Sequence, residues 1–163
     1  YSTKYNMLGY NEAIMKLLRP EPRINEGRIL AENGGRACID ISDGLYASLY
    51  RIARASSVDI EIQWEDLPIS DNVWSFIDAF DAIDDKNIDD KVDAELLINF
   101  GGDFELLTTI PADKVDLISE LLASIGTPIT IIGRVIEGSG KCFKLKEGHR
   151  ELLKEVGYEH FRG

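Results

Sequence analysis

The sequence has few basic residues, no long apolar run and no apolar leader, and each shortage argues against a class of function. Lysine and arginine total 18 against 29 aspartates and glutamates, which gives a net charge of −11. A chain with this net negative charge is repelled by nucleic-acid phosphates and by anionic membranes. No stretch approaches the roughly 20 apolar residues of a membrane span. We therefore expect neither nucleic acid nor membrane as a partner.

Cysteine is also scarce, with Cys38 and Cys142 far apart in apolar, strand-like segments. Buried reduced thiols are commoner in such segments than a disulfide or a metal site, so a cytoplasmic protein is expected. The 163 residues, 44% of them hydrophobic, suffice for one domain with a core. The chain begins at Tyr1, not at methionine, which indicates a fragment or a processed product.

Apolar periodicity predicts alternating helices and strands. Helices are expected over residues 11–18, 24–33, 43–56, 89–99 and 112–124, with a further helix after Ser70 whose core face carries Val73, Trp74, Ile77 and Phe80. Strands are expected over 37–41, 58–64, 104–110, 129–136 and 141–146, the last two paired as an edge hairpin. This pattern predicts an α/β (α+β) fold, a mixed sheet covered by helices. Residues 1–23 are interpreted as a helix and proline-rich junction, and 24–163 as the domain.

The most informative stretch is residues 37–45, in which a buried strand runs through the turn Ser42-Asp43-Gly44 into a helix. Ser42 or Asp43 can cap that helix, and its N-terminus favours anions. Asp40 and Asp43 would repel a phosphate unless divalent cations lay between them, as Mg²⁺ does in phosphoryl-transfer sites. Two interpretations of the turn stay open: it only caps the helix, or it binds a phosphate through divalent cations.

A second stretch, Gly101-Gly102-Asp103, enters the expected strand at 104–110. Two glycines allow close approach to a ligand, although a helix end followed by a turn explains them equally. Residues 78–93 carry seven aspartates but lack the glycine and terminal glutamate of a calcium loop, so a solvated surface is expected. Near the C-terminus, Tyr158 either stacks on a planar ligand or anchors the tail.

Together the stretches Asp40-Ile-Ser-Asp-Gly-Leu, Gly101-Gly-Asp-Phe-Glu-Leu, Gly133-Arg-Val and Gly157-Tyr-Glu-His-Phe, with Arg19-Pro-Glu-Pro-Arg upstream, resemble the C-terminal half of thiamine-monophosphate kinases. These belong to the aminoimidazole-ribonucleotide-synthetase superfamily. The resemblance covers nearly the whole chain from about Asn11. It implies a cytoplasmic enzyme that uses Mg²⁺ and ATP to phosphorylate thiamine phosphate directly, at a site between two domains near a dimer interface.

The resemblance also implies roles for individual residues. Asp40 and Asp43 would be Mg²⁺ ligands, with Asp43 also catalytic, and Ser42 would contact ATP. Gly102, Asp103 and Tyr158 would lie at the thiamine phosphate. Many members read Gly-Gly-Glu-Asp-Tyr-Glu-Leu, and an ungapped match puts Gly102 at the position of the first Glu, so Asp103 would have to supply that contact.

The family's N-terminal domain, with its further metal-binding aspartates, is absent from this chain. We therefore expect the isolated chain to be inactive as a kinase. Two alternatives stay open: another ATP-dependent synthetase of the same superfamily, or a non-catalytic domain that binds a ligand or partner.

Overall fold

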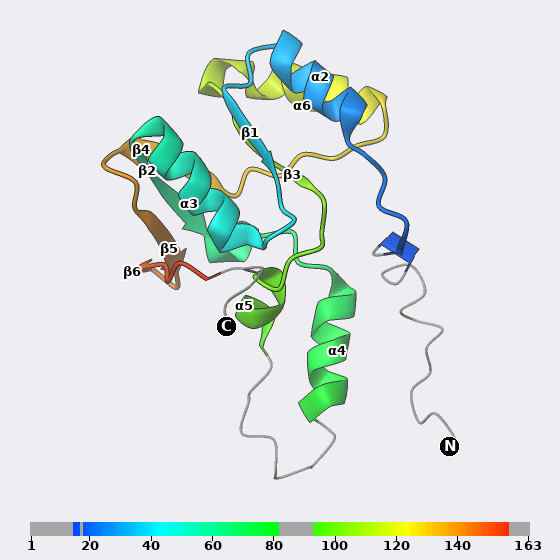
Figure 1. The fold of residues 1–163 in the computed structure, drawn as a ribbon, viewed down its shortest axis with the longest axis vertical. Helices are drawn as coiled ribbons and strands as arrows, with labels where there is room; N and C mark the ends of the chain where they lie inside the picture. Colours follow the sequence, from blue (N-terminus) through cyan, green and yellow to red (C-terminus); the bar gives the residue numbers. More distant parts are fainter. Residues whose placement is uncertain (1–14, 17, 82–92, 157–163) are drawn as a thin grey trace, which may run out of the picture.

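The computed structural model describes residues 15, 16, 18–81 and 93–156 (Figure 1). Most of the helix expected over 11–18 lies outside these residues, as do most of the acidic run and Tyr158. Within them the fold is a mixture of helices and two sheets, which confirms the predicted α+β class. No helix in these ranges has the length and apolarity needed to cross a membrane.

The predicted helices and strands mostly occur, with shorter bounds. The helices are α2 (Ile24–Glu32), α3 (Leu45–Ser56), α4 (Asp71–Asp81), α5 (Ala94–Ile98) and α6 (Val115–Ser124), with short 3-10 turns at Trp64–Asp66 and Ala112–Lys114. The strands are β1 (Ala37–Asp40), β2 (Val58–Gln63), β3 (Leu106–Thr109), β4 (Gly133–Glu137), β5 (Cys142–Lys146) and β6 (His149–Leu152).

The strands form two separate sheets. β1 and β3 pair antiparallel, with Ala37 opposite Thr109 and Asp40 opposite Leu106. The larger sheet has the order β4-β2-β5-β6, in which β2 is antiparallel to β4 and parallel to β5. β6 pairs antiparallel with β5 and completes a mixed sheet.

The predicted hairpin between β4 and β5 is wrong, because β2 lies between them. The connection crosses the end of β2, where Asp59 Oδ1 accepts hydrogen bonds from the backbone N–H groups of Ser139, Gly140 and Lys141 at 2.8, 3.1 and 2.8 Å. Gly140 also donates to the Val58 carbonyl. These bonds hold the loop across the strand end, so β4 and β5 each bind one edge of β2.

Two apolar clusters stabilise the fold. The larger joins α3 to the four-stranded sheet, and its members include Tyr46, Leu49, Ile52, Ala53, Ile60, Ile62 and Cys142. The smaller contains Leu30, Ile118 and Leu122 and joins α2 to α6, which lie together beside β1 and β3 (Figure 1). Burial on this scale is the main favourable term in folding.

The two cysteines have different surroundings, so the expectation of two buried thiols is half wrong. Both are free, but Cys38 is exposed while Cys142 is fully buried. Alternate residues of β1 are exposed, and this places Cys38 and Asp40 on one outward face. The burial of Cys142 beneath α3 raises the pKa of its thiol to about 12.

The predicted core face of α4 is only partly buried. Val73, Ile77 and Phe80 are half-buried, but Trp74 is 44% exposed, contrary to the expectation. The helix stands away from both sheets alongside α5 (Figure 1). Leu96 of α5 is 50% exposed as well. Helical periodicity shows that a face is apolar, but it does not show what covers that face.

A buried carboxylate interrupts the expected alternation of β2. Glu61 is only 5% exposed and accepts hydrogen bonds from Arg134 Nη2 at 2.7 Å and from Arg150 Nε at 2.8 Å. Burial alone would raise the pKa of Glu61, but the hydrogen bonds from the two arginines outweigh it and lower the pKa.

We expect Glu61→Gln to destabilise the fold by about 1 kcal/mol at pH 7, a modest value because both arginines remain partly solvated. A carboxyl whose pKa is lower in the folded state stabilises above its unfolded pKa of about 4.5 and loses that effect as the pH falls further. The difference between wild type and variant should therefore shrink below about pH 4.5. Urea unfolding across pH 3–7 measures it. Glu137→Gln, an exposed residue of β4, is the control, and equal pH profiles would contradict the prediction.

Candidate functional site

Two loops that are distant in sequence are bound to each other at the centre of the molecule. We call residues 41–44, which follow β1, the aspartate loop, and residues 99–102, which follow α5, the glycine loop. The Gly102 N–H donates to the Ser42 carbonyl at 2.9 Å, and the Ile41 N–H donates to the Glu105 carbonyl at 2.8 Å. The two informative stretches of the sequence therefore meet in space, as a single site requires.

Glycine is required where the loops touch. Gly44 has φ 94° and ψ 160°, a region that is essentially restricted to glycine. A Cβ on Gly44 would lie 2.5 Å from the Asn99 carbonyl oxygen, and a Cβ on Gly101 would overlap the Ser42 carbonyl oxygen. Neither neighbour can move aside easily, because both are backbone atoms.

The N-terminus of α3 is capped by the glycine loop, so the prediction that Ser42 or Asp43 caps it is wrong. Gly44 holds the N-cap position and offers no side chain. Asn99, 8% exposed, accepts a hydrogen bond from the Tyr46 N–H at 2.9 Å and donates one to the Glu95 carbonyl at 2.8 Å. The side chains of Ser42 and Asp43 are therefore not used in capping this helix.

The two aspartates differ in their partners. Asp40 ends β1 on its outward face and makes no ion pair within the described part of the chain. Asp43 Oδ2 lies 2.5 Å from Arg51 Nη1. Arg51 is in α3, and its side chain reaches back to the aspartate loop. The ion pair engages Oδ2 of Asp43, so Arg51 competes with a metal ion for that oxygen.

Asp40 and Asp43 can supply some of the oxygen ligands of a Mg²⁺ ion, but not a complete set. Mg²⁺ in phosphoryl-transfer sites commonly takes one or two protein carboxylates, with phosphates and water filling its other positions. Asp40 and Asp43 match that requirement. In the residues that the structure describes, no three acidic, histidine or cysteine side chains gather closely enough to hold a metal without such help.

Three residues, Asp103, Phe104 and Glu105, follow the glycine loop and precede β3. Asp103 is exposed, yet partial desolvation of its carboxylate, and then the nearby Glu105 carboxylate, raise its pKa. Phe104 has φ 53°, which is unusual for a bulky residue. Glu105 accepts a hydrogen bond from Arg23 Nη2 at 2.9 Å, which connects β3 to the segment before α2.

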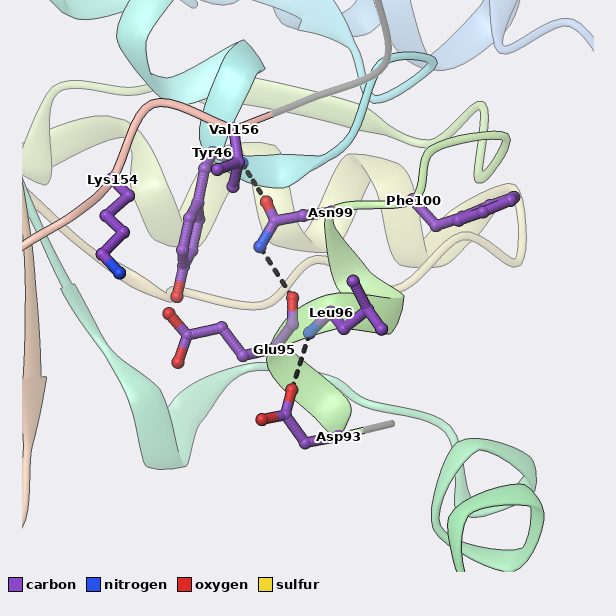
Figure 2. Close-up of a pocket in the computed structure, with 8 residues that line it drawn as sticks. All are labelled: Tyr46, Asp93, Glu95, Leu96, Asn99, Phe100, Lys154 and Val156. Carbon is purple, nitrogen blue, oxygen red and sulfur yellow. Dashed lines mark hydrogen bonds between the residues drawn. The ribbon is translucent and has the colours of Figure 1, made fainter. Parts of the chain in front are cut away.

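Two hollows lie near the joined loops. The first, of about 390 Å³, adjoins Asp40 and Phe104. The second, of about 410 Å³, lies beside α5 (Figure 2). Its lining comprises Tyr46, Asp93, Glu95, Leu96, Asn99, Phe100, Lys154 and Val156.

Two polar side chains, those of Tyr46 and Glu95, line the second hollow. Figure 2 shows the Tyr46 hydroxyl directed toward the Glu95 carboxylate, although no partner within hydrogen-bonding geometry occurs among the described residues. Glu95 in turn accepts a hydrogen bond from Lys144 Nζ at 2.6 Å. Burial and then the carboxylate of Glu95 raise the pKa of Tyr46, so its hydroxyl stays protonated.

The structure brings together most of the residues that the sequence singled out. Ser42, Asp43 and Gly102 lie on the joined loops, Asp40 and Asp103 directly flank them, and Tyr158 is outside the described residues. Sequence reasoning missed the further residues Asn99, Arg51, Arg23 and Phe104. Phe104 alone carried a signal, since it is an aromatic residue two positions after the diglycine.

The fold and its joined loops define the class: a two-sheet α+β domain with an acidic strand-to-helix turn. The chain belongs to the family of AIR synthase related protein C-terminal domains, because the sequence model of that family matches residues 3–146.

Within that family the chain is similar to thiamine-monophosphate kinases. The protein from Pyrococcus horikoshii is 35% identical over 148 residues, which cover 91% of this chain and 41% of that protein. The Escherichia coli K12 protein is 32% identical over 149 residues, covering 91% and 42%. The chain thus spans about two fifths of the length of the curated relatives it matches.

Solved structures agree with this placement. AaThiL complexed with AMPPCP and TMP has a TM-score of 0.69 at 30% identity, over 92% of this chain and 41% of that chain. Thiamine-monophosphate kinase from Stenotrophomonas maltophilia K279a has a TM-score of 0.66 at 32% identity, over 86% and 40%.

Proposed function

We propose that this chain is the C-terminal part of an ATP- and Mg²⁺-dependent thiamine-phosphate kinase, which forms thiamine diphosphate and ADP. The observation that supports the proposal most is the junction of the two loops, in which the Gly102 N–H donates to the Ser42 carbonyl and so joins the two stretches that the sequence singled out. Relatives that bear the kinase name match almost the whole chain, and one related structure holds AMPPCP, an analogue of ATP, together with TMP.

Each residue of the junction has a task in this reaction. Asp40 and Asp43 would hold Mg²⁺, which would supply positive charge to neutralise the phosphates. Ser42 contacts ATP, and Asp43 is the catalytic carboxylate once Arg51 has released it. Transfer is direct, because the phosphate of the acceptor is already ionised near neutral pH and positioning contributes more than a general base.

The acceptor contacts come from the other loop and the C-terminal tail. Gly102 leaves room beside Ser42, Asp103 supplies a carboxylate and Tyr158 covers the thiamine. The chain spans about two fifths of the length of its relatives. In this proposal an N-terminal domain supplies the remaining aspartates and nucleotide contacts, and the complete enzyme is a homodimer. The isolated chain has no kinase activity.

A second function, that of a synthetase from the same superfamily, rests on a weaker likeness. HypE from Escherichia coli has a TM-score of 0.65 but only 21% identity, which shows a shared fold. A shared fold does not indicate which acceptor the enzyme would use. A panel of phosphate-bearing acceptors, tried with the complete enzyme, would separate the two functions.

The proposal is tested by calorimetric titration of the chain with ATP, first with Mg²⁺ and then with EDTA. Because carboxylates repel a bare triphosphate, we expect measurable binding with Mg²⁺ and at least tenfold weaker binding without it. Equal binding in EDTA, or none in either condition, would contradict the proposal. Mixing the chain with Mg²⁺, ATP and thiamine phosphate should yield no thiamine diphosphate. If thiamine diphosphate appeared, only the claim that the isolated chain is inactive would be refuted, and the proposed reaction would stand.

A further inference from the structure

Arg51 brings a positive charge from the middle of α3 to the aspartate loop. Its Nη1 lies 2.5 Å from Asp43 Oδ2. Side chains of a helix lean toward its N-terminus, so Arg51, in the second turn of α3, can reach back beyond Gly44 to the residue before it. The Arg51 side chain is 52% exposed and that of Asp43 is 25% exposed, so solvent reaches both partners. The pair is therefore open to exchange with ions from solution.

The fold of α3 does not rest on this ion pair. The start of the helix is capped by Asn99, which accepts a hydrogen bond from the Tyr46 N–H at 2.9 Å. The apolar face of the helix packs in the larger core cluster, where Leu49 and Ile52 are buried. A partly exposed ion pair adds little to stability. Arg51 can therefore exchange its partner while the helix stays folded.

The position of the guanidinium group is unfavourable for a cation that has no negative partner. Asp43 directly precedes Gly44, the N-cap of α3, so Arg51 directs its charge toward the helix end that carries a partial positive charge. Asp43 compensates for that charge as long as the pair holds. A guanidinium group that lost Asp43 would pair strongly with a phosphate, whose oxygens can accept two parallel hydrogen bonds from it.

The aspartate loop offers a metal ion few oxygens while Arg51 is paired, because Asp43 Oδ2 is engaged. Within the described ranges, no third acidic, histidine or cysteine side chain completes a metal-binding group with Asp40 and Asp43. Mg²⁺ commonly takes phosphate oxygens and water beside one or two carboxylates. A metal ion alone should therefore displace Arg51 poorly. A metal ion bound to a triphosphate brings both the missing oxygens and a new partner for Arg51.

We propose that Arg51 couples metal binding to nucleotide binding at the aspartate loop. Its guanidinium group competes with a metal ion for Asp43 and, when Asp43 binds the metal of a Mg²⁺–nucleotide complex, pairs with a phosphate of that nucleotide. Arg51 is thus a binding residue for the triphosphate and a competitor of the metal ion alone. The inference rests on the proposed function, because it requires a triphosphate beside this loop.

Binding of Mn²⁺ without nucleotide tests the competition. Mn²⁺ prefers the same oxygen ligands as Mg²⁺, and electron paramagnetic resonance detects it directly. Arg51→Met keeps a long side chain and removes its charge. We expect this variant to bind Mn²⁺ roughly threefold to fivefold more tightly than the wild type, the range of a partly exposed ion pair. Arg51→Lys, which keeps the positive charge, should bind Mn²⁺ almost like the wild type.

Calorimetric titration with Mg²⁺-ATP tests the phosphate contact. Arg51→Met frees Asp43 but loses the contact with phosphate, and the two effects oppose each other. A hydrogen bond between charged groups contributes roughly tenfold or more to affinity, which exceeds the gain from freeing Asp43. We therefore expect Arg51→Met to bind Mg²⁺-ATP roughly threefold or more weakly than the wild type. Arg51→Lys should lie between them, because lysine contacts phosphate without the bidentate geometry of arginine.

Arg54→Met is the matched control. Arg54 lies in the last turn of α3, its side chain is 58% exposed, and it pairs with the carboxylate of Glu155. Its removal changes the net charge by the same amount, away from the aspartate loop, and both affinities should stay at the wild-type value. A second control places Arg51→Met in an Asp43→Asn background. There it should no longer tighten Mn²⁺ binding, because the competition requires Asp43.

The outcomes separate this coupling from the proposed function, and thermal unfolding shows that each variant is folded. Opposite changes in the two affinities, confined to Arg51→Met, support the coupling. The coupling is overturned, while the proposed function stands, if Arg54→Met gives the same changes or if Mn²⁺ binding does not respond to Arg51→Met. It is also overturned if Arg51→Met binds Mg²⁺-ATP as tightly as the wild type. If the wild type does not bind Mg²⁺-ATP, the proposed function fails for this chain and the coupling fails with it.

Discussion

Gly44→Ala should lower the free energy of unfolding by about 3 kcal/mol or more and abolish binding at the loop junction. The backbone of Gly44, at φ 94° and ψ 160°, lies where a residue with a Cβ is strained by roughly 1–3 kcal/mol. The added Cβ would also lie 2.5 Å from the Asn99 carbonyl oxygen, far inside van der Waals contact. Relief requires the glycine loop to move away, which breaks the Asn99 cap on α3. Urea unfolding measures the stability, and calorimetry with Mg²⁺-ATP measures the binding.

Gly126→Ala is the matched control for this substitution. Gly126 also has a positive φ, of 79°, but a Cβ there would meet nothing within 4 Å. Its replacement should cost only the strain of a left-handed alanine, about 1–2 kcal/mol, and leave binding intact. If both variants lose the same stability, the close approach of the two loops is not what requires glycine at position 44.

The elements that sequence reasoning placed correctly are those determined by local pattern. The helix ending at Ser56 and the strand from Val58 follow from apolar spacing, and their bounds agree within two residues at most ends. The turn at Gly44 was also visible, because a glycine between a strand and a helix has few other uses. These signals arise from neighbours in sequence, so a single chain suffices to detect them.

The incorrect predictions concern partners that are distant in sequence. Nothing near Tyr46 indicates that Asn99 caps α3, because the bond joins residues 53 positions apart. The spacing of β4 and β5 fits a hairpin, and only the contacts of Asp59 with residues 139–141 show that β2 separates them. Short apolar strands carry little information about pairing order, since several partners bury the same side chains.

The exposed face of α4 and the orientation of Phe104 show a further limit. Amphipathic spacing predicted that Trp74 would be buried, yet it is 44% exposed in this chain. The backbone conformation of Phe104 has no signature in composition, since left-handed residues are usually glycine, asparagine or aspartate. Strain and exposure are properties of the folded state, and they mark sites that sequence patterns miss.

Asp40→Asn should reduce the affinity of the chain for Mg²⁺-ATP at least tenfold while leaving stability almost unchanged. Asp40 is exposed at the end of β1 and makes no ion pair with any described residue, so loss of its charge removes a metal ligand and little else. Asp43→Asn is a less clean test, because it also releases Arg51.

The same titration in EDTA should show wild type and Asp40→Asn converging, since neither then holds a cation between carboxylate and phosphate. Asp113→Asn removes one exposed charge far along the chain from the aspartate loop and controls for the net charge of −11. If Asp113→Asn weakened Mg²⁺-ATP as much as Asp40→Asn, the acidic chain would be attracting Mg²⁺ by its overall field, and Asp40 would not be a ligand. A loss confined to Asp40→Asn, and present only with Mg²⁺, is what direct coordination requires.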